Sequence, residues 1–351
     1  MQKVLTYTLR EEDMTATAGG LVNLVLKNCV KVTGHEISAA KFTPDGITCD
    51  GALIHVSERM SPGQTLRVVL PEEKDETKLI AAEGPVRVLY EDEDLIAVDK
   101  LPGEVVHPGP GHYTDTIANR ITWYLQQTSA APASGLRVIG RLDKETSGVL
   151  IYAKNRAAAA RLQRQRREGT FVRTYLAVCE GIFPAGQRTG TIDLPIEKEP
   201  GVLMRMRAAE DGGLRAVTHY EVLKELSAAC SLLQVTIETG RTHQIRVHMA
   251  AIGHPLVGDT LYGTGTVQAE DHVKSMPDAG AAQAAEEFSA HTDFRAAYPL
   301  TGPTHALLHA AQVRLLQPFT GERLRIVSRI TAEFADLPHC TEETAKRAGG
   351  V

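Results

Sequence analysis

The segment from Leu136 to Gly169 restricts the fold more than any other part of this sequence. Two apolar stretches, LRVIGRL (136–142) and VLIYAK (149–154), are typical of buried strands, and the polar turn DKETSG (143–148) separates them. An alanine- and arginine-rich stretch from Arg156 to Glu168 predicts a helix, which Gly169 is expected to end. The segment therefore predicts a strand, a tight turn, a second strand and a basic helix in succession.

The chain has 351 residues, which suggests about two domains. Residues 1–83 contain nine lysines and arginines against twelve acidic residues and end in the polar run PEEKDETK (71–78), a predicted linker. Within them, residues 21–29 have helical apolar spacing, residues 47–56 alternate as strands do, and residues 65–70 predict a strand. We therefore predict a small α/β module at 1–83.

A second domain is predicted at 84–338. Its strand-like segments include VRVLYED (86–92), DLIAVDK (94–100), SLLQVTIETG (231–240), ALLHAAQVRLLQPF (306–319) and ERLRIVSRI (322–330). Residues from about 263 to 304 are rich in alanine, glycine, serine and acidic residues with little periodicity, so we expect an insertion there. Residues 339–351 are predicted to form a frayed tail.

Composition excludes several classes of protein. With 43% hydrophobic and 23% charged residues the chain has the makeup of a globular protein. It has no run of about 18 apolar residues, and its N-terminus turns acidic where a signal peptide would turn apolar, so we expect a cytoplasmic protein without membrane contact. The five cysteines are scattered and form no CxxC pair, which argues against a disulfide framework or a thiolate metal site.

Charge is distributed unevenly along the chain. The net charge is −5, yet residues 141–176 contain nine lysines and arginines against three acidic residues. In isolation, a basic helix such as 156–167 is usually a solvated face. Beside an active site it would instead neutralise phosphates, which contributes affinity without base specificity.

Asp143 is the first candidate for chemistry, because it opens the polar turn directly after a predicted core strand. An aspartate that merely caps the turn is the alternative. The string Gly140–Gly148 (GRLDKETSG) resembles the signature of RluA-type pseudouridine synthases, which carries their catalytic aspartate. Five further segments match the family and occur along the chain in its order: 91–109 (EDEDLIAVDKLPGEVVHPG), 173–177 (RTYLA), 240–248 (GRTHQIRVH), 253–259 (GHPLVGD) and 308–310 (LHA).

The resemblance covers about residues 85–328 and implies an α+β fold, the pseudouridine synthase fold, with a mixed, largely antiparallel β-sheet and flanking helices. It also implies an isomerase that converts uridine in RNA into its C-glycoside isomer with no cofactor and no metal. In agreement, the sequence has no GxxxxGK[ST] motif for a nucleotide cofactor. The expected substrate is 23S-type large-subunit ribosomal RNA, acted on by a monomer; a tRNA synthase, or an RNA-binding ribosome-assembly factor independent of turnover, are the alternatives.

The resemblance assigns roles to individual residues. Asp143 would be the catalytic carboxylate, which attacks the sugar, attacks the base, or removes a proton to form a glycal. Because the uridine must flip out of the RNA, Arg141 would act as the wedge. Tyr175 would lie against the target base unless it is a core aromatic, and Arg246 would pair with Asp143 unless it is a surface residue. The remaining predicted RNA-binding residues are Arg164, Arg166, Arg167 and Arg241.

Histidines raise the alternative of a metal hydrolase. On a strand His243 and His248 point to opposite faces, and on a helix they lie about 140° apart, so one element cannot aim both at one ion. We therefore expect His243, His248 and His254 to serve hydrogen bonding and packing, with no metal.

Three segments of the first 83 residues resemble an S4-type RNA-binding domain: ISAAK (37–41), GITCDG (46–51) and SPGQT (61–65). This S4-like module departs from the pattern, because residues 33–36 (TGHE) replace the usual Ser-Arg opening of the binding helix. Together with its acidic balance, this predicts that the module orients RNA weakly or has a structural role.

Overall fold

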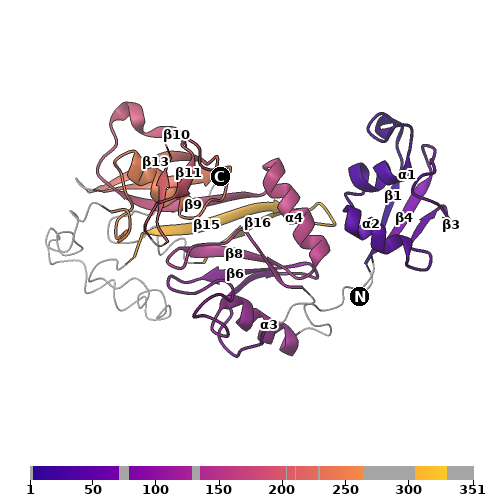
Figure 1. Ribbon diagram of the computed structural model, residues 1–351, viewed down its shortest axis with the longest axis horizontal. Coiled ribbons are helices and arrows are strands. Elements are labelled where there is room, and N and C mark those ends of the chain that lie inside the picture. The colour runs from indigo at the N-terminus through magenta and orange to yellow at the C-terminus, as the bar shows by residue number, and fades with distance from the viewer. Residues whose placement is uncertain are drawn as a thin grey trace.

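The computed structural model describes residues 3–70, 79–128, 135–202, 204–209, 211–227, 230–263 and 305–329. These residues form a ten-stranded sheet, a four-stranded sheet and a two-stranded ribbon. In Figure 1 the four-stranded sheet and its helices lie as a separate module beside the larger sheet. The predicted linker, most of the predicted insertion and the predicted tail lie outside the described residues. Within them, no helix is long and apolar enough to cross a membrane.

The ten-stranded sheet is mixed and largely antiparallel, which confirms the predicted fold class. Every hydrogen-bonded pair is antiparallel except β8 and β15, which run parallel. In spatial order its strands are β10 (Thr189–Asp193), β13 (Val217–Ser227), β14 (Cys230–Ile237), β9 (Val172–Glu180), β15 (Leu308–Leu316), β8 (Ser147–Ala153), β6 (Leu95–Lys100) and β5 (Val88–Glu91), with β16 (Arg323–Val327) on β15 and β7 (Arg137–Ile139) on β8.

Helices flank this sheet. They are α3 (Ile117–Thr128), α4 (Arg156–Glu168) and α5 (Gln244–Ala251), with a short 3-10 turn, η3 (Ala185–Gln187), and the ribbon of β11 (Ile196–Lys198) and β12 (Met206–Ala208). Helix α4 has the predicted bounds. The side chain of Asn155 accepts a hydrogen bond from the Ala158 amide at its start, and Gly169 ends it in a left-handed conformation with φ 73°.

Strands β6 and β8 form the centre of the core and are buried on both faces. Alternate residues contribute to two different apolar clusters. Ile96 and Leu150 pack with α3, whereas Ala97 and Ile151 pack with α4. This double burial explains why both strands appear in the sequence as nearly continuous apolar runs, and it places the turn between β7 and β8 on a rigid support.

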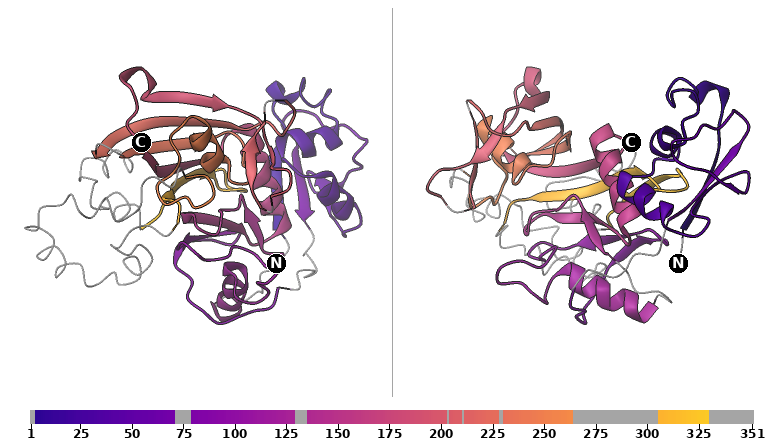
Figure 2. Two further views of the ribbon diagram at one scale, coloured as in Figure 1. Left: turned by 60° about the vertical axis from the view of Figure 1, so that its left-hand side comes forward. Right: turned by 45° about the vertical axis from the view of Figure 1, so that its right-hand side comes forward.

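The N-terminal module, residues 3–70, has its own sheet and core. Its elements are β1 (Lys3–Thr8), η1 (Glu11–Asp13), α1 (Val22–Leu24), the π-helical η2 (Val25–Cys29), α2 (Gly34–Lys41), β2 (Ile47–Cys49), β3 (Ala52–Leu53) and β4 (Thr65–Leu70), with strand order β1-β4-β2-β3. The helical spacing at 21–29 and the strands at 47–56 and 65–70 are confirmed; β1 was not predicted. Figure 2 shows the module next to α4.

Candidate active site

Asp143 lies in the turn that joins β7 to β8, and its half-buried side chain lines a pocket. The turn is closed by the Thr146 amide, which donates to the backbone carbonyl of Asp143 at 3.1 Å. No described residue hydrogen-bonds to the Asp143 carboxylate or forms an ion pair with it. The carboxylate therefore does not cap the turn, and it is available to a molecule bound in the pocket.

A buried lysine holds this turn from inside. Lys100 is 0% exposed, and its ammonium donates to the carbonyls of Lys144 at 2.6 Å, Thr146 at 2.7 Å and Leu101 at 3.0 Å. All three of its donors are thus used. Burial lowers the pKa of Lys100 to about 7, although neighbouring carboxylates, Asp143 among them, act in the opposite direction. Three hydrogen bonds from one fixed group make the turn a rigid mount for Asp143.

Gly148 fits the end of the turn against the neighbouring strand. Its φ is +106°, and a Cβ here would lie closer than 3.0 Å to three backbone atoms of Ala310. Next to it, Ser147 Oγ and His309 Nδ1 share a buried hydrogen bond of 2.8 Å. These contacts join the turn to β15. At this point β15 pairs with β8, the one parallel pairing among the described strands.

The pocket around Asp143 combines one carboxylate, one aromatic ring and several guanidinium groups. Tyr175 on β9 is 4% exposed, and its hydroxyl accepts a hydrogen bond from Arg173 Nη1 at 3.4 Å. The pocket is also lined by Arg141, Arg166, Arg173 and Arg241, and by the apolar Val138, Leu142, Ile237, Ile245 and Leu308. Apolar lining residues suit a flat base, and the arginines suit the phosphates on either side of it.

Two of these arginines, Arg166 and Arg173, carry positive charges that repel each other. Burial lowers the pKa of Arg166, and the charge of Arg173 lowers it further. Arg173 Nη2 donates to the backbone carbonyls of Ile139 at 3.2 Å and Gly140 at 3.0 Å, and these bonds hold its guanidinium in place. A bound phosphate would offset this repulsion.

Arg246 does not pair with Asp143, so that prediction is wrong. Its guanidinium makes two hydrogen bonds to Asp259, from Nε at 2.7 Å and from Nη2 at 2.6 Å, and both side chains are buried. Burial alone would lower the pKa of Arg246, but the hydrogen bond and charge of Asp259, then the charge of Asp143, raise it. Arg246 is not among the residues that line the pocket, but its positive charge lies close enough to act on Asp143.

The predicted RNA-binding arginines occupy different places. Arg141, Arg166 and Arg241 line the pocket. Arg141 is exposed, whereas Arg241 is held by a hydrogen bond of 2.9 Å from its Nε to the carbonyl of Arg215. Arg164 lines a separate groove, and Arg167 is exposed to solvent.

The histidines serve hydrogen bonding and packing, which confirms the prediction. His248 contacts Thr218 Oγ1 and the carbonyl of Leu194, both at 2.9 Å, and His243 contacts the Tyr262 hydroxyl at 2.9 Å. The ring of His254 stacks on Phe183.

Comparison with known proteins identifies the family. A family model described as RNA pseudouridylate synthase matches residues 94–251. The ribosomal large subunit pseudouridine synthase D of Nitrosomonas europaea is 34% identical over 291 residues, which cover 83% of this chain and 75% of that protein. The protein of the same name from Xanthomonas campestris is 35% identical, covering 85% of this chain and 82% of that protein. This chain belongs to the RNA pseudouridine synthase family.

One similar solved structure is that of human RNA pseudouridylate synthase domain containing 4. It is 23% identical to this synthase with a TM-score of 0.49, covering 75% of this chain and 92% of that chain.

Two supporting residues of this synthase were not assigned a role from the sequence. Lys100 and Arg173 both lie in segments that match the family, but only the fold shows that each binds the backbone on one side of Asp143. For Arg173 the sequence did contain a signal, because it lies on a buried strand two positions before Tyr175. A buried arginine requires a partner.

Acid is expected to destabilise the synthase through His309. Burial lowers the pKa of His309 to about 3, whereas the unfolded chain has a histidine pKa of about 6.5. Between pH 6.5 and pH 3 the unfolded state binds more protons than the folded state. The stability that comes from keeping His309 neutral in the core is therefore present above pH 6.5 and is lost as the pH falls towards 3. By pH 5.5 the loss should reach about 1 kcal/mol.

The measurement is urea unfolding at pH 7.5 and pH 5.5. The variant His309→Gln should lose less stability over this interval than the wild type. The exposed His35, changed to glutamine, is the control and should keep the wild-type dependence. An identical pH dependence in His309→Gln would contradict the assignment.

Proposed function

We propose that this synthase isomerises uridine in large-subunit ribosomal RNA and that Asp143 is its catalytic carboxylate. The observation that carries the proposal is the Asp143 carboxylate, which has no partner among the described residues and lies in a pocket with Tyr175 and four arginines. The large-subunit substrate is supported by the names of relatives that are 34% and 35% identical.

The reaction moves one bond and one proton. The bond from C1′ of the ribose to N1 of uracil breaks, a bond from C1′ to C5 forms, and the hydrogen on C5 is replaced by one on N1, so no atom is gained or lost. A deprotonated Asp143 begins each route, whether as a nucleophile towards the sugar or base or as a base that removes a sugar proton. The rigid support from Lys100 keeps the carboxylate in position while the uracil turns.

The uridine reaches Asp143 only after it leaves the base stack, which costs a few kcal/mol. Arg141 is exposed and lines the pocket two residues from Asp143, and in this proposal it fills the space that the base leaves. Tyr175 offers an aromatic contact for the flipped base, and Arg166 and Arg173 offer charge for its phosphates. We further propose that the protein acts in the cytoplasm as a monomer without a cofactor, and that its N-terminal module is S4-like.

Pseudouridine mapping tests the proposal. Total RNA from cells with and without the protein is labelled with carbodiimide and analysed by primer extension. We expect a signal in large-subunit ribosomal RNA that disappears on deletion and returns with the wild-type gene but not with Asp143→Asn. Loss confined to tRNA would contradict the substrate, and no change in any RNA would contradict the function.

A further inference from the structure

Residues 240–245 form one wall of the active pocket, and His243 is the one residue among them that does not line it. Its backbone is left-handed, with φ 56° and ψ 20°, at the start of α5. A histidine adopts this conformation far less readily than a glycine, so the backbone of the wall is strained at this point. Such strain persists only where surrounding contacts hold the residue in place.

Tyr262, which does not line the pocket either, holds His243. A hydrogen bond of 2.9 Å joins Tyr262 Oη to His243 Nδ1, and the two rings meet edge to face with their centroids 5.7 Å apart. We call this pair the wall anchor. Its contacts offset the strain at His243 and so keep the pocket wall in one conformation.

The direction of this hydrogen bond follows from a third group. The Met206 amide donates to the Tyr262 hydroxyl oxygen at 2.9 Å, so the hydroxyl proton is left to donate to His243 Nδ1. Burial raises the pKa of Tyr262 and lowers the pKa of His243, which favours a protonated phenol and a neutral imidazole. Both partners are therefore in the protonation states that this bond requires.

Tyr262 also contacts the buried ion pair of Arg246 and Asp259. Its ring centroid lies 5.1 Å from Arg246 Cζ, and its amide donates to the Asp259 carboxylate at 3.1 Å. The charge of Asp143 opposes the effect of burial on the pKa of His243, as it does for Arg246. The wall anchor thus connects the pocket wall to an ion pair that, like His243, lies within reach of the Asp143 charge.

The rest of the wall is fastened by Gln244. Its Oε1 accepts hydrogen bonds from the Arg241 amide at 3.1 Å and from Thr239 Oγ1 at 2.7 Å, and its Nε2 donates two to β13. All the hydrogen-bonding groups of this side chain are thus used. None of these bonds involves His243, so the wall anchor is a second and separate fastening of the wall.

We propose that the wall anchor is a positioning device for the isomerisation, in which Tyr262 acts through His243 to hold residues 240–245 at the distance from Asp143 that a turning uracil needs. The inference rests on the proposed function. The base must leave its sugar, turn and rejoin it inside the pocket, so the wall has to stay in place through more than one step. Most of the pocket arginines lie outside the wall, so loss of the anchor should affect turnover rather than affinity.

The test compares single-turnover pseudouridine formation and filter binding on an unmodified large-subunit ribosomal RNA transcript. Tyr262→Phe keeps the ring and removes the hydroxyl, and turnover should fall about 10- to 100-fold, as expected when reacting groups are displaced by up to about 1 Å. The dissociation constant for RNA should change by less than about twofold, because Arg141, Arg166 and Arg173 are retained.

A second variant separates positioning from stability. His243→Gly removes the side chain but suits the left-handed backbone, so relief of strain should offset the lost contact. The midpoint of urea unfolding should stay close to the wild-type value while turnover falls as in Tyr262→Phe. Combining the two changes should cost little more than either change alone, because both break the same hydrogen bond.

Two matched controls make the same chemical changes away from the pocket. Tyr124→Phe removes a tyrosine hydroxyl that donates to Glu91 at 3.0 Å. Ala18→Gly relieves a left-handed backbone with φ 50° at an exposed residue. Neither Tyr124 nor Ala18 lines the pocket, so both variants should keep the wild-type turnover.

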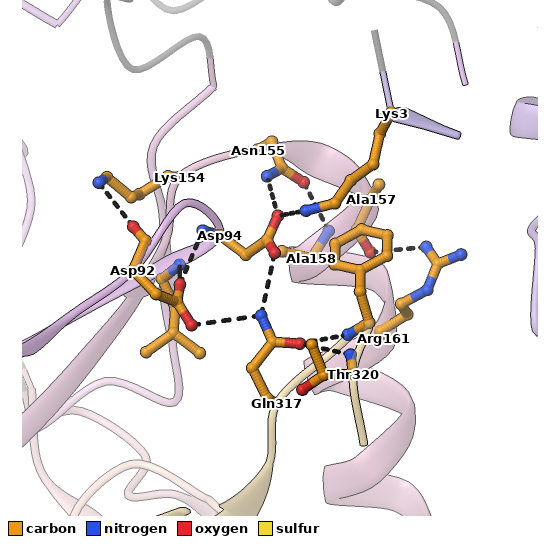
Figure 3. A network of polar contacts seen from close by, with 12 residues as sticks. Lys3, Asp92, Asp94, Lys154, Asn155, Ala157, Ala158, Arg161, Gln317 and Thr320 are labelled. Atoms are coloured by element: carbon orange, nitrogen blue, oxygen red, sulfur yellow. Dashed lines mark hydrogen bonds and ion pairs between the residues drawn. The ribbon is translucent and has the colours of Figure 1, made fainter. Parts of the chain in front are cut away.

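A destabilised variant completes the comparison. Gln317 donates to Asp92 at 3.2 Å and to Asp94 at 2.9 Å in the network of Figure 3, and none of the residues labelled there lines the pocket. Gln317→Ala leaves these buried groups without a donor and should lower the urea midpoint. Turnover measured well below the unfolding temperature should nevertheless remain at the wild-type level.

The outcomes separate the two proposals. Wild-type turnover in Tyr262→Phe, or turnover losses that only follow the urea midpoints across all five variants, would overturn the role of the wall anchor. If the wild type forms no pseudouridine on the transcript, the proposed function fails and this inference with it. If the wild type and His243→Gly form pseudouridine at equal rates, only the wall anchor fails.

Discussion

Replacing Asp143 by asparagine is expected to reduce pseudouridine formation by at least about 10³-fold, as loss of a group that acts directly on the reacting atoms does in other enzymes. The side chain keeps its shape but can act neither as nucleophile nor as base. RNA binding should persist or tighten slightly, because the change removes a negative charge among the pocket arginines. Single-turnover assays on ribosomal RNA, together with filter binding, measure both effects.

Glu145→Gln is the matched control, because it removes a carboxylate from the same turn but not from the pocket lining. It should retain most of the turnover. Substantial activity in Asp143→Asn, or equal losses in the two variants, would mean that the charge of the turn matters rather than the Asp143 carboxylate.

Asp259→Asn should lower the free energy of unfolding by about 3 to 5 kcal/mol, because it leaves the buried Arg246 guanidinium without a counter-charge. The Asp259 carboxylate also accepts hydrogen bonds from the amides of Leu261 at 3.0 Å and Tyr262 at 3.1 Å. The change therefore affects the turn as well as the ion pair. Urea unfolding followed by circular dichroism measures the loss.

An exposed pair provides the control. Arg207 donates to Glu197 at 2.9 and 2.6 Å, but the side chain of Arg207 is exposed and that of Glu197 is only partly buried. Glu197→Gln should cost only about 0 to 1 kcal/mol, because water already solvates both partners. Equal losses for Asp259→Asn and Glu197→Gln would show that burial of the Arg246 pair does not matter for stability.

The segment from β7 to α4 could be predicted closely from the sequence. Its strands are buried on both faces and therefore appear as apolar runs, and Asn155 and Gly169 mark the ends of α4 by local chemistry. By contrast, β1 was not recognised. Its side chains alternate between intermediate and exposed, so it carries no strong apolar signal.

The functional site, like the fold, could be predicted from the sequence only in part. Asp143, Tyr175, Arg141, Arg166 and Arg241 do line one pocket, as their positions in the family's segments implied. The partner of Arg246 was predicted wrongly, since Asp259 accepts both of its hydrogen bonds. Family position indicates that two charges are near each other, but not which of two carboxylates accepts the hydrogen bonds.

The sequence by itself determined the family, the strand-turn-strand-helix unit and the place of Asp143 within it. Each of these depends on signals only a few residues long, such as apolar alternation, a cap or a glycine. Only the tertiary structure decided that Lys100 holds the turn, that Asp259 binds Arg246, and that Glu36 of the N-terminal module pairs with Arg161 of α4. These contacts join elements far apart in the chain, and packing, rather than local periodicity, determines which charges meet.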